Sequence, residues 1–198
     1  MNNISVPPVG YDGWHLSGKK IDKVVRRIED IKDIFSDKQA CEQLPPDKIV
    51  YEVESYLPVP QDSTGGLFFG ITFIHPGEVG NEYFITKGHF HKILNRAEFY
   101  WCIEGEGMLI LMDKHRNTWA EKMYPGSLHY INGYTAHRTA NTGNSILSFG
   151  ACWPSDAGHD YDTISQHGFS KILVNQNGIP ALIDRLQNPI AAMIKTGL

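Results

Sequence analysis

The sequence predicts an all-β protein, built as an antiparallel barrel or sandwich over residues 44–180. Short segments rich in β-branched and aromatic residues follow one another along this range, among them KIVYEVESYLPV, GGLFFGITFIHPG and SILSFGACWP. Turn signals such as GEG at 105–107 and PG at 125–126 separate these segments roughly every 8 to 12 residues. Strands at this spacing, joined by glycine-containing turns, are typical of hairpin-connected sheets.

The overall composition is that of an ordinary globular chain with no affinity for polyanions. The 198 residues carry a net charge of −4 and are 41% hydrophobic, so we expect no nucleic-acid or membrane partner. The N-terminus lacks the apolar core of a secretion signal, and a cytoplasmic location follows as the default. Three cysteines without CxxC spacing argue against disulfides and against a thiolate zinc site.

The two ends of the chain are expected to flank the barrel within a single domain. Residues 1–43 form an N-terminal arm whose segment 20–35, KIDKVVRRIEDIKDIF, predicts an amphipathic helix that packs on the barrel. Residues 181–198 form a C-terminal tail that holds a short helix broken at Pro189.

A cluster of candidate metal ligands lies in the middle of the chain. In GHFHKILNRAEFYWCIEGEG, His89 and His91 are two residues apart, so on an extended strand both imidazoles face the same side. If the loop KILNRA joins antiparallel strands, Glu98 returns beside them, and His137 in NGYTAHRTAN is the candidate fourth ligand. Three imidazoles and a carboxylate suit iron, manganese, nickel or zinc.

The alternative interpretation is that HxH occurs by chance on a strand. Alone, this pair favours that interpretation, whereas the addition of Glu98 and His137 favours a metal site. His129 lies in the same strand region and is a weak competitor for the fourth position. The other histidines lack ligand spacing and are expected to be ordinary polar residues: His15, His75, His115 and His167.

These segments resemble the two sequence motifs of the cupin superfamily. GHFHKILNRAEFYWCIEG follows the first motif from His89 to Gly105, and GSLHYINGYTAHRTAN follows the second from Gly126 to Asn141. The resemblance implies a jelly-roll-like cupin barrel with the metal inside it. Asn132 and Tyr134 depart from the usual proline and glycine of the second motif, which affects a turn and leaves the ligands in place.

A narrower resemblance is to the cupin-type phosphoglucose isomerases, over about residues 45–177. TKGHFH, RAEFY, AHRTAN and PSDAGHDYDTISQHGFSKILV together carry it, and the AGHDY segment lies outside both general motifs. The resemblance implies an isomerase of the intramolecular oxidoreductase class that interconverts glucose 6-phosphate and fructose 6-phosphate in glycolysis and gluconeogenesis. It also implies a homodimer, and one divalent metal per subunit, with Fe²⁺ as the first candidate.

The resemblance further implies roles for individual residues. The metal ligands would be His89, His91, Glu98 and His137, and the catalytic residues Glu98 and Tyr161. Residues around the substrate would be Thr72, Thr86, Gly88, Tyr100, Trp153, His159 and Tyr161. Trp153 stands where the family often has tyrosine, so a hydroxyl contact is lost there.

The chemistry of these residues leaves two routes open. A carboxylate such as Glu98 can move the C2 proton to C1 through an enediol, or hydrogen can shift directly as hydride. The sequence lacks a P-loop, so hydroxyls, a backbone amide and the charges of Lys87 and Arg96 are the candidate phosphate contacts. Rival functions are an iron-dependent cupin dioxygenase, a non-catalytic sugar-binding cupin and an isomerase of another sugar such as mannose 6-phosphate.

Overall fold

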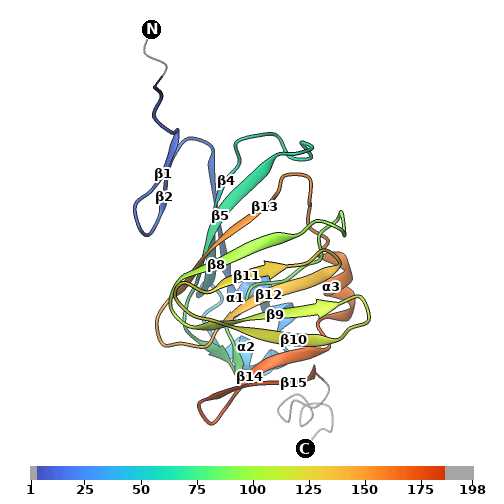
Figure 1. The fold of residues 1–198 in the computed structure, drawn as a ribbon. Coiled ribbons are helices and arrows are strands. Elements are labelled where there is room, and N and C mark those ends of the chain that lie inside the picture. Colours follow the sequence, from blue (N-terminus) through green and yellow to red (C-terminus); the bar gives the residue numbers. More distant parts are fainter. Residues whose placement is uncertain (1–3, 186–198) are drawn as a thin grey trace, which may run out of the picture.

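Two groups of strands enclose the hydrophobic core of the protein, as the computed structural model of residues 4–185 shows (Figure 1). The larger sheet has six antiparallel strands in the order β11-β8-β13-β5-β4-β3. These strands are β3 (Ile21–Arg27), β4 (Ile49–Tyr56), β5 (Leu67–Ile74), β8 (Glu98–Glu104), β11 (Leu128–Ile131) and β13 (Leu147–Pro154). The all-β cupin-type fold predicted from the sequence is confirmed.

Two smaller sheets complete the barrel. One has the order β10-β9-β12 and the other β15-β14-β7-β6. Their strands are β6 (Glu78–Val79), β7 (Glu82–Tyr83), β9 (Gly107–Asp113), β10 (Thr118–Met123), β12 (Thr135–Asn141), β14 (Lys171–Gln176) and β15 (Ile179–Asp184). The extended segment after β7 runs antiparallel to β12, so the two sheets are joined by its backbone hydrogen bonds, such as Thr86 N to Thr139 O at 2.9 Å.

Short helices and a hairpin lie outside the sheets. They are β1 (Val9–Tyr11), β2 (Leu16–Gly18), α1 (Ile28–Ile31), the 3-10 helix η1 (Lys32–Ile34), α2 (Lys38–Gln43) and α3 (Asp162–His167). The hairpin β1–β2 covers part of the outer face of the large sheet, because Leu16 and Trp14 pack against Ile71 and Phe73 there. No helix in the described part of the chain is long and apolar enough to cross a membrane.

The predicted helix over residues 20–35 is wrong for its first half. Residues 21–27 form the edge strand β3, which pairs with β4 from Ile21 opposite Tyr56 to Arg27 opposite Ile49. The spacing of Ile21, Val24 and Val25 fits a helix, but β-branched residues also favour strands, and pairing with a partner strand decides between the two. Helix begins only at Ile28, whose buried side chain and that of Ile31 face the core.

The C-terminal prediction is wrong where the structure describes it. Residues 179–184 form β15, which pairs with β14 along its full length, so they extend a sheet and hold no helix. The expected helix break at Pro189 lies outside the described residues. The large sheet also begins at Ile21, upstream of the barrel start expected at residue 44.

A buried asparagine ties the barrel together near the end of β12. Asn141 is fully buried, and its Nδ2 donates hydrogen bonds to the carbonyls of Ile74 (2.8 Å) and Ser145 (2.7 Å). Its Oδ1 accepts a hydrogen bond from Gly143 N at 2.9 Å. Each buried polar group left without a partner costs about 1–3 kcal/mol, so this side chain fixes the connection between β12 and β13. The final asparagine of the second motif is therefore structural.

Candidate metal centre and substrate cavity

Two of the candidate ligands, His89 and His137, lie close together because the extended segments that carry them pair. His89 and His137 face each other across an antiparallel bridge, with backbone N–O distances of 3.2 and 3.1 Å. Gly88 precedes His89 with φ of +77°, and a Cβ there would lie 2.9 Å from both Arg138 and Phe169. Glycine is therefore required at residue 88 for the chain to bring His89 against β12.

The loop between His91 and Glu98 positions the other two ligands. The Nδ1 of His91 donates a hydrogen bond to the carbonyl of Arg96 at 2.8 Å, which leaves its Nε2 directed at the site. Arg96 in turn is held by a two-point contact with Asp156, at 2.9 and 2.8 Å. Glu98 is the first residue of β8, and its side chain points into the barrel.

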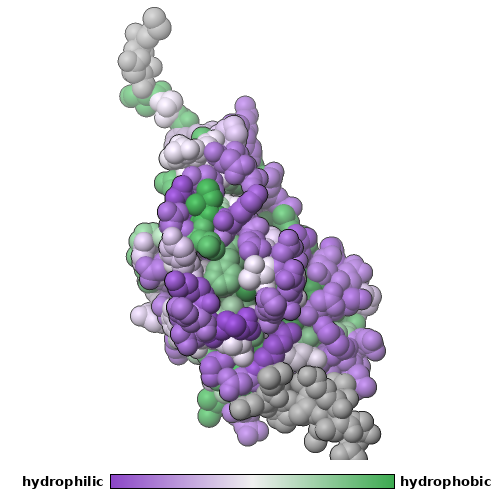
Figure 2. All heavy atoms as spheres, turned by 90° about the vertical axis from the view of Figure 1, so that its right-hand side faces the viewer, coloured by the Kyte–Doolittle hydropathy of each residue, from purple (hydrophilic) through white to green (hydrophobic). Residues whose placement is uncertain are grey.

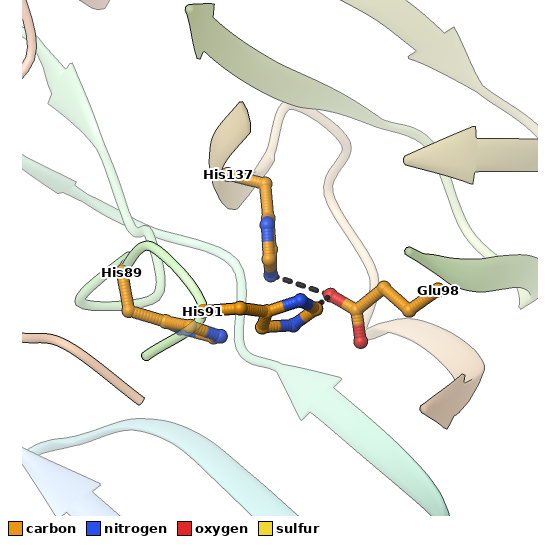
Figure 3. A group of neighbouring side chains, drawn as sticks. All are labelled: His89, His91, Glu98 and His137. Carbon is orange, nitrogen blue, oxygen red and sulfur yellow. Dashed lines mark ion pairs between the residues drawn. The ribbon is translucent and has the colours of Figure 1, made fainter. Parts of the chain in front are cut away.

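The four side chains converge on one another (Figure 3). Their ligand atoms all lie within 4.8 Å of one another, with Glu98 Oε1 at 2.5 Å from His137 Nε2 and 3.6 Å from His91 Nε2. His91, Glu98 and His137 are buried and His89 is partly buried. Each of the four facing atoms is buried, and among the described residues none has a hydrogen-bond partner outside this cluster.

The charges in this cluster suit a cation. Burial lowers the pKa of His89, with help from the neighbouring histidines, so this imidazole is neutral and available as a ligand. Burial opposes the charge of Glu98, yet His137 and His91 outweigh it and hold the pKa of this carboxyl at about 2. Burial likewise opposes the protonation of His91, but Glu98 and the Arg96 carbonyl raise its pKa.

The donor set fits a divalent metal ion. Four buried ligand atoms converge with no hydrogen-bond partner outside the cluster among the described residues, and coordination to one ion would satisfy all of them. Imidazole and carboxylate donors accept iron, manganese, nickel and zinc. This cluster can therefore hold one such ion.

A cavity of about 500 Å³ opens directly onto this cluster. All seven residues expected around the substrate line it: Thr72, Thr86, Gly88, Tyr100, Trp153, His159 and Tyr161. Tyr100 is buried, and burial together with the Glu98 carboxylate raises its pKa well above the usual value. A strip of hydrophobic residues between hydrophilic ones is visible on the face of the molecule turned to the viewer in Figure 2.

The AGHDY segment reaches the cavity through a second backbone bridge. Asp160 pairs with Phe90, at N–O distances of 2.8 and 3.2 Å, so its neighbours His159 and Tyr161 lie beside the metal ligands. The ring of His159 is 4.3 Å from that of His89 and is stacked with that of Tyr161. His159 keeps an exposed edge, but its packing removes water and lowers its pKa.

Two cations line the cavity, Arg26 and Lys87. Lys87 Nζ lies 5.0 Å from the centre of the Tyr161 ring. The expectation that Arg96 supplies charge is wrong, since its guanidinium is engaged by Asp156 away from the lining. Arg26 was not identified from the sequence because its segment was predicted to be a helix. Tyr51 was not identified either, because it carries no sequence signal beyond strand propensity. Tyr51 is a buried lining residue, and burial raises its pKa to about 12.

The departures from the motifs change local packing and leave the ligands in place. Tyr134 adopts φ of +63°, the left-handed conformation for which the motif usually has glycine, and its N–H contacts the Leu94 carbonyl. A non-glycine residue there costs roughly 1 kcal/mol or more. Trp153 packs over Gly70, where a Cβ would come within 3.1 Å of its ring.

His129, the alternative candidate for the fourth ligand, makes hydrogen bonds outside the metal cluster. His129, on β11, bridges Ser127 Oγ (2.9 Å) just before that strand and Glu121 Oε2 (2.7 Å) on β10. His15 and His75 similarly contact Glu54 and Glu52. These three histidines have the structural roles expected of them.

Sequence comparison with known proteins gives one family. The family model described as "Glucose-6-phosphate isomerase (GPI)" matches residues 25–189. The chain is 44% identical over 158 residues to the glucose-6-phosphate isomerase of Thermococcus litoralis, covering 79% of this chain and 82% of that one. It is 42% identical over 178 residues to that of Pyrococcus furiosus, covering 89% and 92%.

Two more distant similarities were found, one to a sequence relative and one to a solved structure. A putative glucose-6-phosphate isomerase of Rhizobium meliloti is 33% identical over 156 residues, covering 77% of this chain and 72% of that one. An oxalate oxidase solved with the substrate analogue glycolate aligns at a TM-score of 0.44 and 10% identity, over 75% of this chain and 58% of that one. A likeness this weak says nothing about chemistry.

Removal of one ligand tests the metal centre. We expect His91→Ala to reduce bound divalent metal from about one ion per chain to a trace after dialysis, because loss of a ligand lowers affinity by at least about 10²-fold. His115→Ala, at an exposed histidine, is the matched control and should retain the metal. Elemental analysis of both purified proteins measures this, and full occupancy in His91→Ala would contradict the ligand assignment.

Proposed function

Because the chain belongs to the glucose-6-phosphate isomerase family, we propose that its metal centre and adjoining cavity together interconvert glucose 6-phosphate and fructose 6-phosphate. The isomerase activity itself, a step of glycolysis, follows from membership of the family. The observation that supports this proposal is that three of the four ligand residues, His89, Glu98 and His137, line a cavity that also presents hydroxyls and two cations.

The phosphate end of the substrate is proposed to lie at Arg26 and Lys87. Both line the cavity, and their flexible, positively charged side chains can bind a phosphate group. Thr86 Oγ1 already accepts a hydrogen bond from Thr139 N at 3.0 Å, so its hydroxyl proton is available for a phosphate oxygen. Thr72, on β5, lines the same cavity and can also donate a hydrogen bond.

The sugar end is proposed to face the metal ligands. A bound divalent ion, with Fe²⁺ as first candidate and Mn²⁺, Ni²⁺ or Zn²⁺ as alternatives, would polarise the carbonyl and the neighbouring hydroxyl as a Lewis acid. Neutral His159 has one donor and one acceptor nitrogen, so it can exchange protons with substrate oxygens during ring opening. Burial raises the pKa of Tyr161, which therefore keeps its proton and acts as a hydrogen-bond donor.

Glu98 is proposed to hold the metal and not to act as a base at carbon. As a metal ligand its carboxylate has reduced basicity, and the histidines beside it also lower its pKa, whereas a general base works best when its pKa is near the operating pH. We therefore favour direct transfer of hydrogen between C2 and C1 over the enediol route.

The chain is also proposed to form a homodimer through the outer face of the large sheet. Four exposed side chains lie there as two cross-strand pairs, Leu128 with Trp101 and Tyr130 with Phe99. The hairpin β1–β2 covers a neighbouring part of this face and leaves these residues uncovered. Contiguous exposed apolar surface of this kind marks a protein interface, and a second copy can bury it symmetrically.

A cytoplasmic location is proposed from the pathway. The reaction consumes and produces sugar phosphates of glycolysis, which are cytoplasmic metabolites. The cysteines Cys41, Cys102 and Cys152 are free thiols, which is compatible with a reducing compartment.

The function is tested by a coupled assay of fructose 6-phosphate conversion. We expect a chelator to reduce the rate to background and re-addition of a divalent metal to restore it, because the ion supplies the Lewis acid. His115→Ala should lose and regain activity in the same way, whereas His91→Ala should not regain it. Unchanged turnover in the fully chelated protein would contradict metal dependence, and no turnover with any divalent metal would contradict the isomerase activity.

The hydrogen-transfer route is tested in deuterated water. Direct transfer predicts that fructose 6-phosphate formed over many turnovers contains no deuterium at C1, as measured by NMR. Deuterium accumulating at C1 faster than in an enzyme-free sample would show that a base exchanges the C2 proton with solvent.

The dimer is tested by light scattering. The unaltered protein should have twice the chain mass of 22.3 kDa, and Trp101→Glu should shift it to the monomer, because a charge would be buried at the centre of the interface. Trp119→Glu on β10, at an exposed tryptophan outside this face, is the control and should remain dimeric. A monomeric mass for the unaltered protein, or a dimeric Trp101→Glu, would reject this interface.

A further inference from the structure

A second, smaller cavity of about 270 Å³ lies next to the substrate cavity. It is bounded by α1 and η1 on one side and α3 on the other, and it shares Lys87 and Asp30 with the substrate cavity. Four basic side chains line it: Lys87, Arg138, His167 and Arg185. None of the roles proposed for the metal centre uses Arg138, His167 or Arg185.

Arg138 is the unusual member of this group because its charge is buried. Only 4% of the residue is exposed, and its Nε has no hydrogen-bond partner among the described residues. Its Nη2 donates to the Lys171 carbonyl at 3.1 Å, and its guanidinium lies 4.3 Å from the centre of the Phe169 ring. Buried arginines are normally paired with a carboxylate, because an isolated charge in the protein interior is costly.

Nearby carboxylates do not make that pair. Glu82 is the buried acid whose field reaches Arg138, but within the described residues no ion pair joins them, and Glu82 Oε1 accepts the Ser36 N–H at 2.7 Å. Asp30 Oδ2 accepts the Arg27 N–H at 2.8 Å. Asp33 is 91% exposed and faces Lys38.

We propose that this cavity is an anion site for inorganic phosphate or the phosphate group of a small metabolite, separate from the substrate phosphate. A phosphate offers several acceptor oxygens to the unpartnered guanidinium edge of Arg138 and to the ammonium of Lys87, with Arg185 and His167 at the rim. Because Lys87 lines both cavities, an anion bound here would interact with the same ammonium group that is proposed to bind the substrate phosphate.

The test uses the metal-loaded protein with its substrate cavity saturated by the equilibrium mixture of glucose 6-phosphate and fructose 6-phosphate. Inorganic phosphate is added against potassium chloride of equal ionic strength, and the Tm is measured. Binding at a second site should raise the Tm by about 3 to 6 °C at ten times the dissociation constant. Phosphate that only competes for the substrate cavity gives no such rise.

Arg185→Gln and Arg138→Gln should each lose this rise. Arg185 is partly exposed and directly follows β15, so its variant remains informative if Arg138→Gln fails to fold. Lys122→Gln, at an exposed lysine on β10 outside both linings, is the charge control and should respond like the unaltered protein. No phosphate-specific rise in the unaltered protein, or equal rises in Arg185→Gln and Lys122→Gln, would overturn the proposal.

Discussion

The metal centre depends on one pairing of extended backbone, that between residues 84–90 and β12. This pairing sets His89 opposite His137, with hydrogen bonds of 3.2 and 3.1 Å in both directions. The alternation of an extended chain then brings His91 to the same side as His89, and the following loop returns to Glu98. Two contacts fix that loop, the Arg96 carbonyl on His91 and the Arg96 guanidinium on Asp156. The ligands are thus positioned by backbone geometry before any ion is bound, so little ordering entropy opposes binding.

The ligands could be predicted from the sequence because their spacing encodes their geometry. Two histidines separated by one residue on a strand must face the same side of it. The motif spacing then indicated Glu98 and His137 as the other two ligands. Arg26 could not be found in this way, since residues 20–35 fit a helical period as well as a strand, and only pairing with β4 decides between them. Arg96 was misjudged for a related reason, because Asp156, which neutralises it, lies 60 residues away along the chain. Contacts of this range leave no local pattern.

The charges in the barrel separate a cation-binding centre from an anion-binding region. The centre brings together three imidazoles and a carboxylate that its neighbours hold ionised, and this donor set favours a cation. The rim contributes Arg26 and Lys87, which favour an anion. The proposed binding mode follows from these charges, with the phosphate of a sugar phosphate at the two cations and its sugar end at the metal ligands. In the proposed mechanism the carboxylate that holds the ion is too weak a base to act at carbon, so ligation and base catalysis compete for one residue.

Gly88 joins the metal centre to the second cavity. A side chain there would meet Arg138 and Phe169 at 2.9 Å, and these are the buried cation and the ring beneath it. The next residue is the ligand His89, and the residue before it is Lys87, which lines both cavities. This glycine therefore lies between a metal ligand on one side and two cations of the second cavity on the other, so the proposed anion site and the metal centre share one peptide segment.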